Sequence, residues 1–168
     1  MSKKKLYHGT TKCAAKNIIK NGIDISFSKK PVDFGSGFYL ADNKMLIAKW
    51  ALQKAAIEND TPAILTFEAD FTGLKVVELE RDLNWARIIH AYRIRLGWSE
   101  HNDVDVIIGP IADGATMREV RRYERSEKSL EDLNILFAAL TRRNYDIQYV
   151  IKSAEAVNRL NIIDKEGV

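Results

Sequence analysis

The chain is poor in the residues that build disulfides and metal centres. It has a single cysteine, Cys13, which cannot form an internal disulfide, and this fits a reducing cytosol. Cys13 precedes two alanines, so we expect a small core residue rather than a nucleophile. His8, His90 and His101 lack the spacing of metal ligands. We therefore expect no metal cofactor.

Long apolar runs and phosphate-binding glycine motifs are also missing. No stretch approaches the ~20 apolar residues of a membrane helix, and no apolar signal core follows the basic run 3–5. There is no Walker-type loop, and Gly35-Ser36-Gly37 lacks the third glycine of the dinucleotide-fold fingerprint. We expect a cytoplasmic protein that does not bind a membrane and does not use a Rossmann fold.

What is present fits one globular domain over residues 1–168. The hydrophobic fraction is 46% and the charged fraction 29%, which is ordinary for such a domain. Segments with strand and helix patterns are mixed without strict alternation, which favours the α+β class over a doubly wound parallel sheet. Strands are expected at residues 5–8, 63–69, 74–79, 104–108 and 147–151, and helices at 12–21, 43–59 and 153–160, with others beginning at Asp82, Thr116 and Ser129.

Positive charge is concentrated at the N-terminal end. Net charge is +3, yet residues 1–30 hold eight lysines and one acid, Asp24, which gives +7 and leaves 3 − 7 = −4 for the remainder. Such a field favours an anionic ligand, for example a pyrophosphate or a nucleic acid. A solvated lysine face is the alternative.

Four arginines recur along one expected helix, at Arg118, Arg121, Arg122 and Arg125. We interpret them as a surface face that is offset by acidic neighbours, or else as a contact for an acidic partner. The acidic neighbours are Glu119, Glu124 and Glu127.

A histidine, a glycine and a threonine form the first candidate binding group. Gly9 leaves its backbone N–H and C=O uncovered, so a flat amide can approach closely. Thr10 adds a hydroxyl. With His8 the trio fits a planar carboxamide and a ribose hydroxyl, although a histidine at a strand end also serves as a structural hydrogen-bonding group.

Two aromatic residues and one glutamine complete the candidate set. Tyr39 follows the glycine loop and Trp50 lies in the next helix. Two aromatic faces can sandwich a positively charged nicotinamide ring, and core packing is the alternative. Gln148 interrupts an apolar strand, on the same face as Val150, and needs either a partner or an aqueous cleft. Exposure at a sheet edge is the other interpretation.

Taken together, these segments resemble the poly(ADP-ribose) polymerase type of ADP-ribosyltransferase. The first motif is Leu6-Tyr7-His8-Gly9-Thr10 with Asn17-Ile18-Ile19 and Gly22-Ile23; the second is Phe34-Gly35, Gly37-Phe38-Tyr39-Leu40-Ala41-Asp42; the third is Gln148-Tyr149-Val150-Ile151. The run 105–113 is similar to that of a group of short bacterial proteins of this clan. The likeness extends from about Leu6 to Leu160.

The resemblance implies a split pair of antiparallel sheets with flanking helices, and NAD in the cleft between the two sheets. It implies that His8 contacts the adenosine ribose, that the Gly9 backbone holds the nicotinamide amide, and that Tyr39 and Trp50 flank the nicotinamide ring. Thr10 and Phe38 complete the implied cofactor-binding set. His8, Tyr39 and Gln148 occupy the positions of the family's catalytic His–Tyr–Glu residues.

Two positions depart from the family pattern. Ile47 stands where the polymerases place a serine that touches the amide. Gln148 stands where they carry a glutamate, which accepts from the ribose 2′-hydroxyl and stabilises the oxocarbenium-like transition state. An amide offers a dipole instead of a full charge, and it cannot act as a general base. Chain elongation is therefore not expected, and Gln148→Glu is expected to increase nicotinamide release.

The function expected from the resemblance is mono-ADP-ribosylation of a protein or nucleic-acid acceptor, with NAD as co-substrate. By analogy, such a compact transferase acts as a toxin, defence effector or regulator, with a neutralising partner protein encoded nearby. Two alternatives stay open. One is an NAD-binding module with weak or no catalysis; the other is a basic adaptor for nucleic acid or protein.

Overall fold

The structure is a computed structural model, and it describes residues 3–26, 32–112, 115–142 and 145–168. Within these residues the chain forms seven strands, six α-helices and one 3₁₀ helix, so the expected α+β class is confirmed. In chain order the elements are β1 (Lys4–Thr11), α1 (Lys12–Asn21), β2 (Phe38–Ala41), α2 (Lys44–Glu58), β3 (Pro62–Ala69), β4 (Val76–Glu78), α3 (Leu83–Arg93), η1 (Ser99–His101), β5 (Val106–Pro110), α4 (Thr116–Glu124), α5 (Leu130–Leu140), β6 (Ile147–Ile151), α6 (Ala154–Val157) and β7 (Leu160–Glu166).

The strands form a sheet in the order β4-β5-β6-β2-β1-β3-β7. All neighbours pair antiparallel except β4 and β5, which are parallel. The expectation of purely antiparallel sheets is therefore wrong at this edge, because α3 crosses over between the two strands and returns the chain in the same direction. Strand β1 pairs with β3 at eight positions but with β2 at only one, Tyr7 opposite Ala41.

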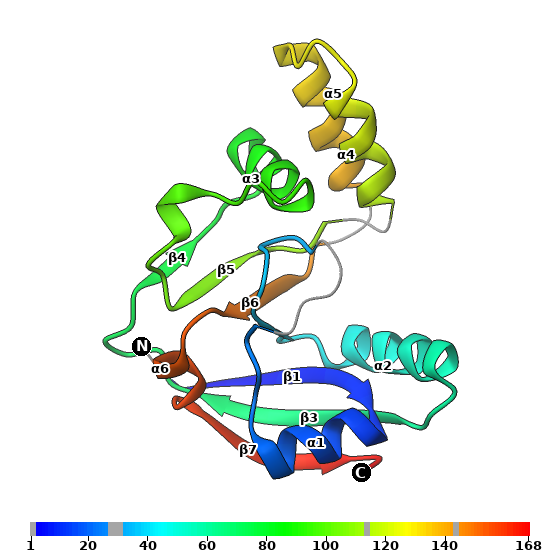
Figure 1. Ribbon diagram of the computed structural model, residues 1–168, viewed down its shortest axis with the longest axis vertical. Helices are drawn as coiled ribbons and strands as arrows, with labels where there is room; N and C mark the ends of the chain where they lie inside the picture. The colour runs from blue at the N-terminus through cyan, green and yellow to red at the C-terminus, as the bar shows by residue number, and fades with distance from the viewer. Residues whose placement is uncertain (1–2, 27–31, 113–114, 143–144) are drawn as a thin grey trace.

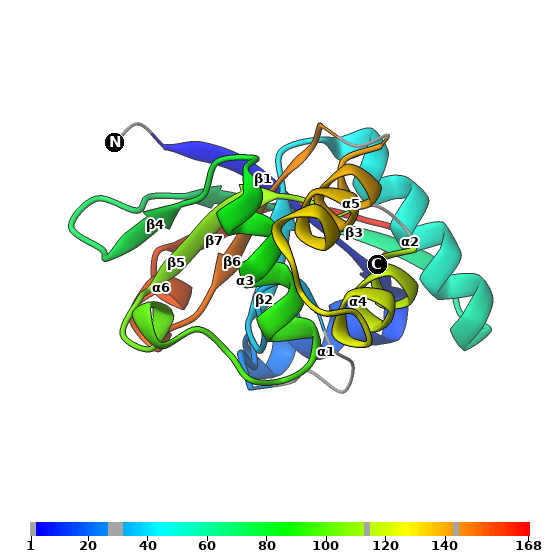
Figure 2. The same ribbon diagram turned by 90° about the horizontal axis from the view of Figure 1, so that it is seen from above.

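Each face of the sheet has its own apolar core. On one face, Leu6, Phe38 and Phe67 pack with residues of α1 and α6. On the other face, α2 covers β1 and β3, while α3, α4 and α5 cover β5 and β6. Figure 1 shows β1, β3 and β7 as the lower part of the molecule, with β5 and β6 above them; Figure 2 shows the helices over the sheet from above. Helices therefore cover both faces of the sheet: α1 and α6 one face, and α2 to α5 the other.

Side-chain caps fix where most helices begin. Asn43 Oδ1 accepts from the backbone N–H groups of Met45 and Leu46 at the start of α2. Ser129 and Asp132 form a reciprocal capping box at α5. Each such cap contributes about 1 kcal/mol to helix stability. The start positions predicted at residues 43, 82 and 129 are confirmed.

Three local expectations are wrong. Helix α4 begins after Ala115, which makes no side-chain cap, and Thr116 is buried in its first turn, so the expected capping box does not form. Strand β5 continues through Pro110, where we expected a stop at Gly109. Cys13 is exposed, because α1 turns Ala15 rather than Cys13 toward the sheet.

The C-terminal segment also differs from its expected helix. Helix α6 ends at Val157, and residues 160–166 form the edge strand β7. Leu160 and Ile162 both pack on the core, which is the two-residue period of a strand. Within the described ranges, none of the helices has the length and apolarity needed to cross a membrane.

Candidate functional site

The sheet comes apart between β1 and β2 at the residues of the two N-terminal motifs. After the single pair Tyr7–Ala41, the described residues of β1 and β2 form no further β-bridge pair, although β1 stays paired with β3 as far as Thr11. Residues 8–10 therefore face residues 38–40 across what we call the β1–β2 opening. In Figure 1 it lies between the lower strands and β6.

The imidazole of His8 spans this opening. Its Nδ1 lies 2.9 Å from the backbone oxygen of Tyr39, and its ring stacks on Phe38 with centroids 4.2 Å apart. Because a carbonyl oxygen only accepts, Nδ1 carries the proton and Nε2 presents a lone pair. His8 is half-buried, and the bond fixes both the position and the tautomer of its ring.

His8 is neutral at pH 7. Burial lowers its pKa to about 4, the charge of Lys54 lowers the pKa further, and the bond to Tyr39 opposes the shift. A neutral imidazole with a free Nε2 is a hydrogen-bond acceptor. The site therefore offers His8 as an acceptor for a hydroxyl group.

The lowered pKa of His8 predicts a loss of stability in acid. Because the unfolded chain binds a proton near pH 6.5 and the folded chain only near pH 4, the stabilising contribution of neutral His8 is lost as pH falls through that window. We expect His8→Gln to remove about 2 kcal/mol of the fall in unfolding free energy between pH 7 and pH 5. Urea unfolding at both pH values measures it. Parallel pH dependences of the two proteins would contradict the assignment.

Tyr39 ties down the segment that precedes β2. Its hydroxyl donates to the Gly35 oxygen at 2.7 Å and accepts from Phe34 N at 3.1 Å. Burial raises the pKa of this phenol well above its usual range. Because neighbouring strand residues point to opposite faces, the Tyr39 ring and the imidazole stacked on Phe38 lie on opposite sides of β2. The structure joins His8 to the Tyr39 backbone and not to its ring.

Gln148 is buried in the interior of the sheet. It lies in β6 between β2 and β5, opposite Ala41 and Gly109, and is 4% exposed. Its Nε2 donates to Asp33 Oδ2 at 2.8 Å and to the Pro110 oxygen at 3.2 Å. The expected need for a partner is confirmed, and exposure at a sheet edge is wrong. With both amide hydrogens used, Oε1 is the atom that remains for a ligand.

Asp33 is a site residue that the sequence analysis did not identify. It is 5% exposed, and its Oδ1 accepts from Arg93 Nε at 3.0 Å and from Nη2 at 2.5 Å. Its Oδ2 accepts from the Ala112 backbone and from Gln148. A single acid before a glycine loop looks like a surface residue. The residue that balances its buried charge, Arg93, lies in α3, sixty residues further along the chain.

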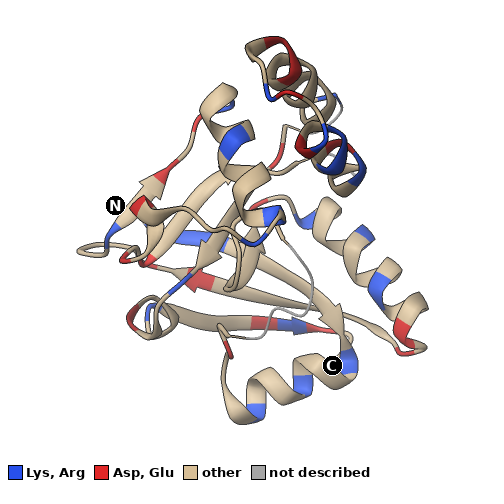
Figure 3. Cartoon of the chain, turned by 45° about the horizontal axis from the view of Figure 1, so that its top comes forward, with Lys and Arg blue, Asp and Glu red and all other residues tan. Residues whose placement is uncertain are grey.

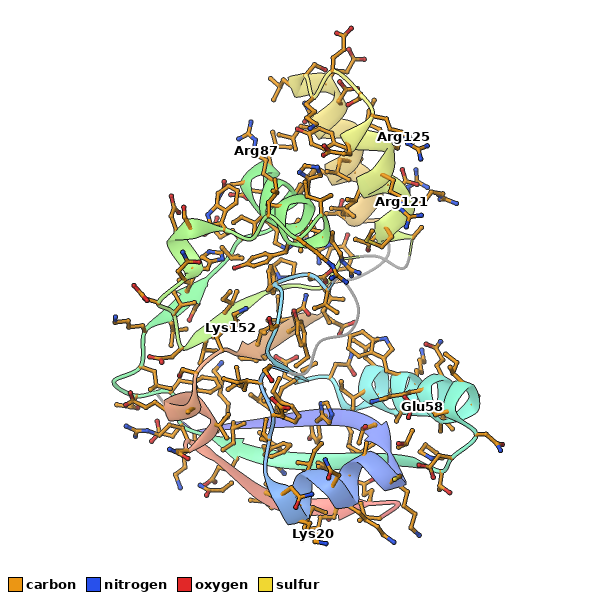
Figure 4. The ribbon with its side chains drawn as sticks, viewed as in Figure 1. Lys20, Glu58, Arg87, Arg121, Arg125 and Lys152 are labelled. Atoms are coloured by element: carbon orange, nitrogen blue, oxygen red, sulfur yellow. The ribbon has the colours of Figure 1, made fainter. Side chains whose placement is uncertain are left out.

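Lys152 holds the same segment from the other side. Its Nζ donates to the backbone oxygens of Phe34 and Ser36 at 2.7 and 2.6 Å, and lies 5.4 Å from the centre of the Tyr92 ring (Figure 4). Burial lowers the pKa of this ammonium to about 8. Asp33, Tyr39 and Lys152 together fix the glycine loop against β6.

The remaining predicted residues lie around helix α2. Thr10 is fully buried, and its hydroxyl oxygen accepts from Lys54 Nζ at 3.1 Å. Trp50 is half-buried and packs in the cluster that contains the buried Ile47. A Cβ atom at Gly9 would lie 2.5 Å from the Ile47 backbone oxygen. Gly9 therefore lets α2 lie directly against β1, beside the opening.

Replacing Gly9 by alanine tests this close packing. The added methyl group meets a backbone oxygen, so α2 must move away from β1. We expect Gly9→Ala to lower the free energy of unfolding by about 1–3 kcal/mol, as overpacking does in other cores. Urea denaturation measures the change. An unaltered midpoint would show that α2 does not lie where the structure has it.

A comparison with protein families adds one finding. A family model described as a protein of unknown function (DUF3990) matches residues 4–162. Because this match covers nearly the whole chain, the chain belongs to that family. No curated protein matches the chain. Among the described residues, no group of three or more His, Cys, Asp or Glu side chains is arranged to hold a metal ion.

Proposed function

We propose that the chain binds NAD at the β1–β2 opening and transfers a single ADP-ribose group from it. One observation carries the proposal. The strand ladder opens at residues 8–10 and 38–40, which are the residues of the two motifs that resemble the NAD pocket of ADP-ribosyltransferases. Neighbouring strands that stop pairing leave backbone groups that a ligand can use.

The sheet topology supports the finer fold assignment. Strands β4, β5, β6 and β2 form one half of the sheet, and β1, β3 and β7 form the other. A single residue pair, Tyr7–Ala41, joins the halves. We propose that this is the split sheet of an ADP-ribosyltransferase fold with NAD between the halves.

Two acceptor atoms, one on each face of the sheet, suit ribose hydroxyl groups. In the part of the chain that the structure describes, His8 Nε2 and Gln148 Oε1 accept no hydrogen bond, and ribose hydroxyl groups donate them. His8 lies with Phe38 on the face that α1 covers, whereas Gln148 lies with Val150 on the opposite face, so the two atoms do not meet on one face. Lys54, whose charge acts on His8, adds a positive field suited to a pyrophosphate.

Asp33, whose charge is balanced by Arg93, strengthens Gln148 as a hydrogen-bond acceptor for the reaction. When the bond between ribose C1′ and nicotinamide breaks, its electrons leave with nicotinamide and positive charge develops on the ribose. The carboxylate of Asp33 accepts from the Gln148 amide at 2.8 Å, which polarises the amide and makes Oε1 a stronger acceptor. Gln148 cannot remove a proton from the acceptor, so that proton passes to solvent.

Calorimetry with NAD, combined with measurement of free nicotinamide, tests the proposal. We expect binding with release of nicotinamide, and loss of both in His8→Ala and Tyr39→Ala. Circular dichroism of the two variants checks that they fold. Binding without release would favour the alternative of an NAD-binding module, and the absence of binding to the folded wild-type chain would refute the proposal.

A further inference from the structure

Helix α4 and its C-cap residue carry four exposed arginines, Arg118, Arg121, Arg122 and Arg125, which we call the α4 arginine ridge. These residues line a hollow of the surface. Residues three and four apart share one helix face, and seven helical residues span about 10 Å, which is long enough to contact more than one phosphate of a strand. Figure 4 shows Arg121 and Arg125 pointing away from the body of the molecule.

Nearby acids balance only part of this charge. Glu119 is buried, and it accepts from Arg118 at 3.0 Å and lies 3.4 Å from Arg122. Glu124, which was expected to offset the ridge, pairs instead with His90 and Lys128. Asp132 also interacts electrostatically with Arg122, so four arginines with two carboxylates leave 4 − 2 = +2 on the ridge. Among the described residues, Arg121 and Arg125 form no ion pair. The expected surface face is thus offset by Glu119 at Arg118 and Arg122.

An exposed aromatic ring lies, in sequence order, between the α4 arginine ridge and Gln148 of the candidate site. Tyr145 is 82% exposed, and the guanidinium carbon of Arg81 lies 4.8 Å from the centre of its ring. It precedes β6, three residues before Gln148. The next residue is anchored, because Asp146 accepts from the Asn43 side chain at 2.6 Å and from the Ile111 backbone at 3.1 Å. A fixed aromatic face exposed to solvent is a platform on which a base can stack.

The start of helix α4 lies close in the chain to a residue of the candidate site. The backbone N–H of Ala112 donates to Asp33, which also holds Gln148, and α4 begins four residues later at Thr116. A strand bound along α4, as proposed below, has one end directed toward this part of the site.

We propose that the acceptor is a single-stranded nucleic acid, with its phosphates on the α4 arginine ridge and an unpaired base stacked on Tyr145. Arginine forks bind phosphate oxygens in pairs. An acidic protein would use the ridge but not the aromatic face, and a duplex would not release a base for stacking. The role as acceptor rests on the proposed NAD-dependent transfer, whereas the binding does not.

The transfer balances without another reactant. The C1′–nicotinamide bond breaks with its electrons leaving on nicotinamide, and C1′ bonds to a nucleophilic nitrogen or oxygen of the nucleic acid. Where that atom carries a proton, the proton goes to solvent, since Gln148 cannot accept it.

Fluorescence anisotropy with labelled single strands of RNA or DNA, about 12 nucleotides long, tests the binding. We expect Arg121→Gln/Arg125→Gln to weaken binding about tenfold and to reduce the slope of log affinity against log salt by about 1.4. Tyr145→Ala should weaken binding about tenfold and leave that slope unchanged. Unlabelled duplex and a polyglutamate peptide serve as competitors, and both should compete poorly.

The matched control is Lys16→Gln/Lys20→Gln on α1, which removes the same charge at the opposite end of the molecule (Figures 3 and 4). It should change affinity less than twofold. Equal losses in the control and ridge variants, no effect of Tyr145→Ala, or tighter binding of polyglutamate would each overturn the proposal.

Labelling with NAD separates this proposal from the proposed function. Nucleic-acid binding as expected, without NAD binding, would leave the surface assignment intact and remove the transferase. Binding and cleavage of NAD without binding of single strands would support the transferase and refute the nucleic-acid surface. Radiolabel from NAD on the oligonucleotide, lost in the ridge variant, would support both.

Discussion

Gln148→Glu is expected to destabilise the protein by about 5 kcal/mol at pH 8. The substitution places a second carboxylate where the amide nitrogen now lies, 2.8 Å from Asp33 Oδ2 in a buried position. Two carboxylates at this distance cannot both ionise, so the introduced glutamate keeps its proton in the folded state. Its pKa is therefore higher in the folded chain than in the unfolded chain.

Because the pKa of the introduced glutamate is higher in the folded chain, the loss of unfolding free energy in Gln148→Glu depends on pH. Below about pH 4.3 the introduced glutamate is protonated in both states, and its hydroxyl can donate to Asp33 as the amide does. Above that pH the unfolded chain releases the proton while the folded chain retains it, so stability falls as pH rises. Urea unfolding of variant and wild type at pH 4.5 and pH 8 should show the larger difference at pH 8. A deficit that is the same at both values would contradict the Asp33–Gln148 contact.

The double variant Asp33→Asn/Gln148→Glu provides the matched control. It exchanges charge and amide between the two positions, so an amide can again donate to a carboxylate across the same contact. We expect the pH-dependent part of the deficit to disappear. If it persists, the two side chains do not interact as the structure has them, and the coupling in the double-mutant cycle would be close to zero.

The same contact changes the expected effect of Gln148→Glu on activity. From the sequence alone, this substitution adds the family's carboxylate and should increase nicotinamide release. The structure adds Asp33, which keeps the new carboxyl protonated. We therefore expect an increase in release, about tenfold or more, from the double variant and not from the single one.

Asp33→Ala is expected to cost about 3–5 kcal/mol of unfolding free energy. The substitution removes the carboxylate that binds Arg93 through two nitrogens, while the side chain of Arg93 is only 18% exposed. It also leaves the Ala112 N–H and the Gln148 amide without this acceptor. Losing one partner of a buried ion pair is costly because the other charge stays desolvated.

A surface pair gives the comparison for Asp33→Ala. Lys3 and Glu68 lie 2.7 Å apart, but their side chains are 64% and 37% exposed. Glu68→Ala should change the free energy of unfolding by less than about 1 kcal/mol. Chemical denaturation of both variants measures the two effects side by side. Similar losses in both would contradict the burial of the Asp33–Arg93 pair.

Local sequence signals predicted most elements of this fold. Asn43 and Ser129 mark helix starts because their side chains satisfy backbone N–H groups within the next three residues. Gly22 ends α1 with a φ of 87°, a conformation that favours glycine. These signals depend on neighbours in the chain, so one sequence is sufficient to find them.

Contacts between distant segments could not be predicted in this way. Asp33 meets Arg93 and Gln148 across sixty and more than a hundred residues, and nothing in its local sequence indicates burial. The pattern of Gln148 showed only that a partner was needed. The edge strand β7 was missed because its short alternation follows directly on a helical turn. The strand order, and with it the position of the opening, depends on the whole sheet.

An NMR titration of the ¹⁵N-labelled chain with NAD tests most directly whether the β1–β2 opening is the binding site. We expect the largest shifts at the backbone amides of residues 8–10 and 38–40, together with a change at the His8 ring nitrogen that faces away from Tyr39. Shifts confined to α4 and α5, or no shifts at millimolar NAD, would contradict the account.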